Sequence, residues 1–299
     1  MLTYCCLRLS AGAAKKGTDL SREPMLAILR TAALSFFCCC MLFSGIAFAG
    51  DEPRACKAQH DLTRLAYALP HTAKRLADRA PLTIVALGSS STAGAGASSP
   101  AASYPSRLAA VLQQAFPSSV INVLNRGVNG EEARDMLNRF ERNIAAEQPD
   151  LVLWQVGTNA VLHDNPVNVV ASAIHEGVVR MKALGADVIL IDAQFAPSVL
   201  AKPENGHMLS LLASTAKETR VGLFPRFAVM RRWREIRNIP FEAFLAPDQL
   251  HMNDWSYDCL ARLLGDAIIE AVIRPQLTAG ANLQSQVPGG AERELRRPE

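Results

Sequence analysis

Residues 82–88, with the sequence LTIVALG, form the clearest predicted β-strand of the chain. The run is short, apolar and rich in β-branched residues, and it ends on a glycine, which is typical of a strand buried on both faces of a sheet. Four later runs have the same character, at residues 120–124, 151–156, 188–191 and 221–224. We therefore predict a five-stranded sheet.

Segments with helical character lie between these strands, and the clearest are residues 104–116, 132–144, 167–184 and 254–273. Strands that alternate with helices favour a parallel sheet with helices on both faces. We therefore predict the α/β class, as a three-layer α/β/α sandwich. A chain of 299 residues is long enough to bury one sizeable core of this kind.

Sequence composition predicts four parts in the chain. Residues 1–49 hold a signal peptide with an N-terminal extension, residues 50–80 a helical appendage, and residues 81–275 the main domain. Within the appendage, residues 56–69 place apolar side chains at helical spacing. Residues 276–299 are rich in Gln, Gly, Pro and charged residues without a periodic apolar face, and we predict that they are disordered.

The N-terminal part has the features of an export signal. Arg30 precedes an apolar run at residues 31–43, and residues 47–49 form the small-x-small pattern of a cleavage site. The apolar run is shorter than the ~20 residues that a membrane-spanning helix needs. We expect cleavage after Ala49 and an exported protein, periplasmic or secreted, with no stable membrane span. The start at Met1 or at Met25 stays open.

The charge of the mature chain argues against nucleic acid as a partner. Cleavage after Ala49 removes five of the 31 Lys and Arg residues and two of the 28 Asp and Glu residues, which leaves 26 of each. Binding to nucleic acid depends on a clustered excess of positive charge. One basic cluster is present and is predicted to be a solvated helix face: Arg231, Arg232, Arg234 and Arg237.

Two of the seven cysteines, Cys56 and Cys259, lie beyond the predicted cleavage site. In an oxidising compartment they either form a disulfide between the N-terminal segment and the last helix or stay as two separate buried thiols, and both alternatives are open. The spacing of Cys and His residues does not resemble a metal site. We expect no metal and no cofactor.

Three polar motifs follow the first three predicted strands: GSSST at residues 88–92, NRGVNG at residues 125–130 and GTN at residues 157–159. The carboxyl ends of parallel strands border a crevice with free backbone donors. Serine in a tight turn can serve as a nucleophile, while glycine N–H groups and an asparagine amide can stabilise a developing negative charge. Each motif alone is equally consistent with an ordinary turn.

A fourth motif, PDQLHMN at residues 247–253, precedes the last predicted helix. Asp248 and His251 are three residues apart, so one turn can bring the carboxylate against the imidazole. A carboxylate that accepts the Nδ1 proton leaves Nε2 free to take a proton from serine. The four motifs together therefore indicate nucleophilic catalysis by a serine.

These motifs resemble the four conserved blocks of the SGNH hydrolase superfamily, also called GDSL-like esterases and lipases. The resemblance implies a flavodoxin-like fold and a triad of Ser90, Asp248 and His251. It also implies an oxyanion hole formed by the Ser90 N–H, the Gly130 N–H and the Asn159 amide. The activity expected is that of an exported serine esterase that hydrolyses acyl or acetyl esters.

The sequence departs from the usual family pattern at two places. Ser89 stands where an acidic residue is usual, so a neighbouring serine is open as the nucleophile, although alignment through Gly88 favours Ser90. Thr158 and Ala160 flank Asn159, which leaves the subfamily open. The expected substrate is a small acyl ester or an acylated glycan, whose acyl and alcohol parts are open, as is the oligomeric state of the protein.

Other functions fit the sequence to different degrees. The sequence lacks the G-x-S-x-G nucleophile elbow that is typical of α/β-hydrolases. The two glycines within residues 94–96 are not followed by the third glycine of a dinucleotide-binding loop. An O-acyltransferase acting on glycan hydroxyls would use the same residues, and a non-catalytic carbohydrate-binding module of the same fold is the other alternative. Gln194 and Phe195, just beyond the fourth strand, are candidates for the substrate pocket.

Overall fold

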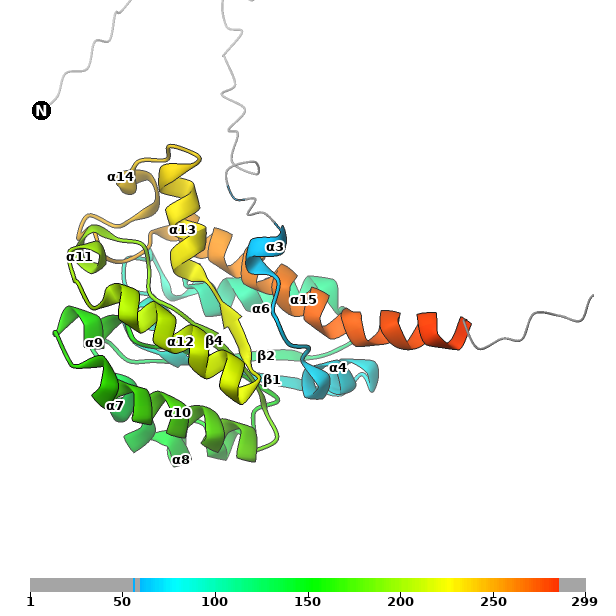
Figure 1. Cartoon of the computed structure of the whole chain (residues 1–299). Helices are drawn as coiled ribbons and strands as arrows, with labels where there is room; N and C mark the ends of the chain where they lie inside the picture. The colour runs from blue at the N-terminus through cyan, green and yellow to red at the C-terminus, as the bar shows by residue number, and fades with distance from the viewer. Residues whose placement is uncertain (1–55, 57–59, 285–299) are drawn as a thin grey trace, which may run out of the picture. The chain divides into compact units, whose positions relative to one another are not determined.

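Five parallel strands form the centre of the structure, in the order β2-β1-β3-β4-β5 (Figure 1). The computed structural model describes residue 56 and residues 60–284 of the chain. The strands are β1 (Leu82–Gly88), β2 (Ile121–Gly127), β3 (Leu151–Gln155), β4 (Asp187–Ile191) and β5 (Gly222–Phe224). The predicted five-stranded parallel sheet is confirmed, and each strand begins within one residue of its predicted start.

The helices of the described residues connect these strands. The longer ones are α4 (Pro70–Ala77), α6 (Tyr104–Ala115), α10 (Val167–Ala183), α12 (Asn205–Thr219), α13 (Arg226–Glu235) and α15 (Asp254–Gln284). The shorter ones are α3 (His60–Thr63), α5 (Ser90–Ala93), η1 (Pro100–Ala102), α7 (Ala133–Asn138), α8 (Phe140–Asn143), η2 (Ala145–Glu147), α9 (Thr158–Leu162), α11 (Pro197–Leu200) and α14 (Phe241–Phe244).

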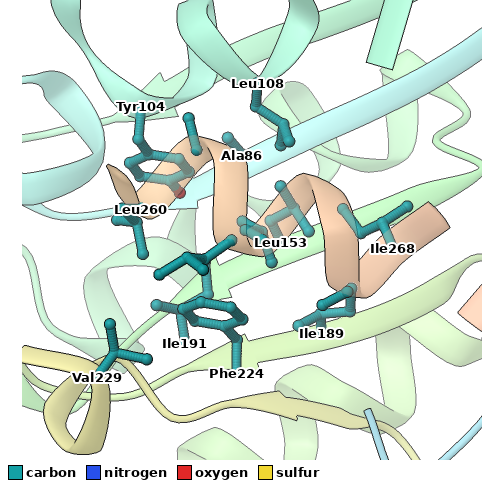
Figure 2. Packing of buried hydrophobic residues seen from close by; sticks show 14 of the residues in the cluster. Ala86, Tyr104, Leu108, Leu153, Ile189, Ile191, Phe224, Val229, Leu260 and Ile268 are labelled. Carbon is teal, nitrogen blue, oxygen red and sulfur yellow. The ribbon is translucent and has the colours of Figure 1, made fainter. Parts of the chain in front are cut away.

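The sheet separates two hydrophobic cores, because successive side chains of a strand point to opposite faces. On one face, Ala86 and Leu153 pack with residues of α6, α13 and α15, as Figure 2 shows. On the other face, Leu87 and Trp154 pack with residues of α7, α8, α10 and α12. The predicted three-layer α/β/α sandwich is therefore confirmed.

The strand order places the point where the winding of the sheet reverses between β1 and β3. After β1 the chain crosses to β2 on one side, and after β2 it returns to β3 on the other side of β1. This is the doubly wound order of flavodoxin-like folds, in which ligands bind beyond the carboxyl ends of the strands where the winding reverses. The first three polar motifs lie at this end of the sheet.

The N-terminal segment differs from its prediction. Of the helix expected over residues 56–69, the described residues contain α3 (His60–Thr63); Pro70 disfavours a helical conformation at Leu69 and instead begins α4. Leu65 and Leu69 are buried in the same core as strand residues. Residues 60–80 therefore pack as part of the main domain, and all described residues belong to the unit Asp51–Glu299.

The last helix is longer than predicted. It continues to Gln284, past residue 273, so the residues 276–284 that were predicted to be disordered are helical. Four strong helix formers, two Leu and two Ala, lie between Pro275 and residue 284 and favour continuation of the helix. The rest of the predicted tail and the predicted signal peptide lie outside the described residues. No helix among the described residues is long and apolar enough to span a bilayer.

A disulfide joins Cys56 to Cys259, which are 203 residues apart in the sequence. Cys259 is buried in α15, and the Cα atoms of the pair are 5.3 Å apart. The sequence left open a disulfide or two separate buried thiols, and the structure contains the disulfide. It ties the N-terminal segment covalently to α15.

Candidate active site

Three consecutive serines follow β1, and the structure separates their roles. Ser89 and Ser91 are buried, with exposed fractions of 2% and 1%. Ser90, the first residue of α5, is partly exposed, and its Oγ lies 2.7 Å from Nε2 of His251. Ser90 is therefore the serine that lies within hydrogen-bonding distance of the imidazole.

Gln155, the last residue of β3, binds the turn formed by residues 88–92, which is called the serine turn below. Its Oε1 accepts hydrogen bonds from the Ser89 N–H and the Ser89 hydroxyl, each at 3.0 Å, and from the Thr92 hydroxyl at 3.2 Å. Sequence reasoning missed this residue. The available signal was a polar residue that ends the otherwise apolar strand LVLWQ, where a buried amide needs partners.

Asp248 and His251 form the second half of the site. The Asp248 Oδ2 lies 2.5 Å from Nδ1 of the imidazole, while Oδ1 accepts hydrogen bonds from the backbone N–H groups of Leu250 and His251. Burial acts to raise the pKa of Asp248, but the hydrogen bonds from the imidazole and the two N–H groups outweigh it, so this pKa lies below its ordinary value. The carboxylate is thus charged at neutral pH.

Two buried apolar residues fix the loop that carries this pair. Leu245 and Met252 form an isolated antiparallel bridge, and the Ala246 N–H donates to the carbonyl of His251 at 2.8 Å. Gly96 packs against the loop with φ +86°, and a Cβ there would lie 2.5 Å from the Met252 carbonyl oxygen. Close approach of the two segments therefore requires glycine at this position.

The other predicted site residues follow β2 and β3: Gly130 lies in the loop between β2 and α7, and Asn159 lies in the first turn of α9. Gly130 is exposed and has φ +80°, a conformation that favours glycine. The Asn159 amide, 8% exposed, donates from Nδ2 to the carbonyl of Glu131 at 2.9 Å. The loop after β2 also meets the serine turn, because the Val128 N–H donates to the Gly88 carbonyl at 3.0 Å. Hydrogen bonds thus connect the first motif to the second, and the third motif to Glu131, the residue that follows the second.

Gly127 allows this close approach. An added Cβ would lie 2.2 Å from the backbone nitrogen of Ala93 and 2.6 Å from the carbonyl carbon of Thr92. Asn125 bridges the same two segments, since its Nδ2 donates to the Thr92 carbonyl and its Oδ1 accepts from the Gly127 N–H. The end of β2 and the serine turn are therefore packed backbone to backbone.

We expect Gly127→Ala to destabilise the protein by about 3 kcal/mol, because the methyl group overlaps main-chain atoms that cannot rotate away. Urea denaturation measures this change. Gly206→Ala is the matched control: a Cβ at Gly206 meets nothing within 4 Å, so the free energy of unfolding stays equal or rises. Equal stability of the Gly127→Ala and wild-type proteins would contradict the contact.

The candidate pocket residues beyond β4, Gln194 and Phe195, are both buried. Gln194 is 1% exposed, and its Oε1 accepts hydrogen bonds from Arg226 Nη2 at 2.9 Å and from the Thr158 hydroxyl at 3.3 Å. Phe195 packs edge-to-face on Phe227 and stacks on Phe241. The segment turns inward after the strand, so its side chains fill the core instead of lining an open surface.

A group of buried ionisable side chains lies next to the end of β4. Arg226 is fully buried and donates from Nε to the Asp192 carbonyl at 2.9 Å. Burial raises the pKa of the Asp192 carboxyl to about 7 and that of the Tyr104 hydroxyl to about 12. Tyr104 lies 3.3 Å from the Thr92 hydroxyl, which connects it to the serine turn.

A cavity of about 470 Å³ lies beside the Asp248–His251 loop. Its lining comes from α14, from the loop and from the segment after α5: Gly96, Phe241, Glu242, Leu245, Ala246, Pro247, Gln249 and Asn253. Ser90 and His251 do not line it, so the cavity borders the site and does not contain it. Among the described residues, no group of three or more His, Cys, Asp or Glu side chains is arranged to hold a metal ion.

Comparison with known proteins gives one family match. The model of the non-GDSL lipase-like family matches residues 55–274, about three quarters of the chain. An acetylxylan esterase of Geobacillus stearothermophilus is 34% identical over 58 residues. That match covers 19% of this chain and 26% of the relative.

Two solved structures resemble the described fold. A two-domain esterase active on acetylated mannans, crystallised with mannopentaose, has a TM-score of 0.60 at 19% identity, covering 72% of this chain and 57% of that chain. The crystal structure of an acetylxylan esterase from Geobacillus stearothermophilus has a TM-score of 0.53 at 22% identity, covering 62% of this chain and 94% of that chain. At these identities the likeness is one of fold.

Proposed function

This chain belongs to the non-GDSL lipase-like family, and on that premise we propose that it is an exported serine esterase that removes acyl groups, above all acetyl groups, from glycans. The observation that carries the proposal is the continuous chain of contacts from Ser90 through His251 to Asp248. Three groups so arranged, at the carboxyl end of a parallel sheet, match the chemical requirements of acyl transfer through a serine.

In the proposed first step, His251 Nε2 accepts the Ser90 hydroxyl proton over the 2.7 Å contact while Oγ attacks the ester carbonyl carbon. The Asp248 carboxylate accepts a hydrogen bond from Nδ1–H, so the proton on that side of the ring stays on Nδ1, and the carboxylate stabilises the imidazolium that forms. The negative charge on the former carbonyl oxygen is stabilised by the Ser90 and Gly130 N–H groups and by the Asn159 amide.

The proposed intermediate then collapses. The imidazolium gives its proton to the leaving alcohol, and an acyl group is left on Ser90. His251 next accepts a proton from water as the water attacks the acyl carbon, and the acid leaves as Ser90 recovers its proton. These residues supply every proton transfer in the sequence of steps.

An acetylated glycan is the proposed substrate class because the named relatives with this fold act on acetylated mannans or acetylated xylan. Export is supported by the apolar run and cleavage pattern at residues 31–49. The Cys56–Cys259 bridge also supports it, since disulfides persist in oxidising compartments. Transfer of the acyl group to a sugar hydroxyl instead of water would use the same residues.

Hydrolysis of p-nitrophenyl acetate, butyrate and octanoate, and release of acetate from acetylated xylan and acetylated glucomannan, test this proposal. We expect the highest kcat/KM with acetate esters and free acetate from at least one glycan. Acetate that appears on an added sugar acceptor would establish transfer. A wild-type protein that releases no acid from any ester would contradict the hydrolase and would favour a carbohydrate-binding role.

A further inference from the structure

Glu131, in the segment between β2 and α7, forms an arginine–carboxylate pair with Arg139, the residue that follows α7, and the triad chemistry does not use this pair. Arg139 donates from Nε to both carboxylate oxygens of Glu131, each at 2.9 Å, and from Nη2 to Oε2 at 2.6 Å. The side chains are 9% and 16% exposed. This forked and largely buried geometry is among the stronger ion-pair arrangements in proteins.

Arg139 holds both ends of one loop. Besides Glu131, which follows Gly130, its Nη2 donates to the carbonyl of Arg126 at 2.7 Å, at the end of β2. Residues 127–130 are the part of the chain between these two attachment points. One guanidinium therefore limits the distance between the start and the end of the loop.

Glu131 also contacts Asn159, whose amide is one of the proposed oxyanion donors. The Glu131 carbonyl accepts the hydrogen bond from Asn159 Nδ2 at 2.9 Å. Through its side chain and its carbonyl, Glu131 thus links Arg139 to Asn159, while its own nitrogen is joined to Gly130. The positions of both proposed donors, the Gly130 N–H and the Asn159 amide, therefore depend on where Glu131 lies.

We propose that the Arg139–Glu131 pair positions the oxyanion hole, by holding the Gly130 N–H and the Asn159 amide in the places that the transition state requires. This inference rests on the esterase function proposed above. Arg139 and Glu131 are positioning residues, since neither touches the reacting atoms in this scheme. The predicted helix 132–144 is interrupted at Arg139, which lies between α7 and α8.

Electrostatic stabilisation of an oxyanion needs donors that are fixed before the reaction begins. A displacement of about 1 Å in a reacting geometry can lower a rate about 100-fold. Arg139 Nη1 is buried without a hydrogen-bond partner, so the charge of this guanidinium is balanced mainly by Glu131. Loss of the carboxylate would leave a buried cation unpaired and would drive the loop to rearrange.

The test compares Glu131→Gln, Arg139→Met, Arg139→Lys and the double variant Glu131→Gln/Arg139→Met in the full chain. Each is assayed with p-nitrophenyl acetate and with the matching thionoester, whose sulfur accepts hydrogen bonds more weakly than oxygen. We expect the single variants to lower kcat and kcat/KM together, by about 10- to 100-fold, because the lost interaction belongs to the transition state. The preference for the oxygen ester should fall with them.

Two comparisons separate positioning from general stability. Arg134→Met removes an arginine–carboxylate pair from the adjacent helix α7, Arg134 to Glu176 at 2.8 Å, and should leave kcat and the oxygen preference unchanged. The double variant should lose about as much as one single variant, because the two residues act as a pair. Arg139→Lys, which keeps the charge without the fork, should recover part of the rate.

Thermal melts identify any variant that fails to fold, and Glu131→Gln and Arg139→Lys then carry the test. Full kcat and an unchanged oxygen preference in folded variants would overturn the positioning role while leaving the esterase intact. A drop of activity equal for the oxygen ester and the thionoester would also overturn it. A wild type without esterase activity would refute the proposed function, and this inference with it.

Discussion

Ser90→Ala should abolish ester hydrolysis, with kcat lowered by about three to six orders of magnitude. Its hydroxyl is the one in the GSSST turn that lies against His251 Nε2, and alanine leaves no group that can form the acyl intermediate. Steady-state assays with p-nitrophenyl acetate measure the loss. Labelling by a fluorophosphonate, followed by mass spectrometry, should modify Ser90 in the wild type.

Ser89→Ala is the matched control for this substitution. The Ser89 hydroxyl faces Gln155 and is buried, so its removal costs a hydrogen bond of about 1 kcal/mol in stability. Activity should stay within about tenfold of wild type, because Gln155 still accepts from the Ser89 N–H. Loss of activity in Ser89→Ala with activity kept in Ser90→Ala would move the nucleophile to the neighbouring serine and refute the proposed triad.

Asp248→Asn should lower kcat by about two to four orders of magnitude with little change in fold. One oxygen of this carboxylate accepts from two backbone N–H groups, and the amide oxygen of asparagine can keep those bonds. The amide nitrogen then faces His251 Nδ1. Because both would be donors, the imidazole shifts its proton to Nε2, where it can no longer accept one from Ser90.

The control for Asp248→Asn is Asp254→Asn, which changes a nearby carboxylate that binds Ser98 through its N–H at 2.8 Å and its hydroxyl at 2.5 Å. This variant should keep wild-type kcat. Full activity in Asp248→Asn would show that the carboxylate does not orient the imidazole. Equal loss in both variants would indicate a general effect of charge.

The pKa of Asp248 also predicts how its contribution to stability depends on pH. A carboxyl whose pKa is lower in the folded than in the unfolded protein stabilises the fold above the unfolded value of about 3.9, and this contribution disappears as the pH falls through the folded value. Thermal melts of wild type and Asp248→Asn should therefore differ more at pH 7 than at pH 3. A difference that grows on acidification would contradict the lowered pKa.

Most of the fold was predictable because its signals are local. The inner strands β1, β3 and β4 are short apolar runs, because burial on both faces of a parallel sheet requires that composition, whereas the edge strand β2 also carries polar residues. The predicted ends were less accurate where a local pattern competed with tertiary contacts. The helix expected at residues 132–144 is interrupted at Arg139, whose side chain binds Glu131, and the last helix continues beyond Pro275.

The candidate site was predictable as a set of residue types but not as a geometry. Asp248 and His251 lie three residues apart, and their contact is a property of one turn. The position of Ser90, 161 residues away, against His251 follows from the sheet order and from the loop held by Leu245 and Met252. Gln194 and Phe195 were proposed from their position beyond the fourth strand, and position at a strand end does not reveal which way a side chain points.

The amino-acid sequence by itself determined the α/β class, the five strands, and the residue types that carry the chemistry, because hydrophobic periodicity and short-range spacing are properties of neighbouring residues. Only the tertiary structure decided that Ser90 and not Ser89 meets the imidazole, that Gln194 is buried, and that Arg139 holds Glu131. These outcomes depend on contacts between residues distant in the chain, which form only when the strands and helices pack together.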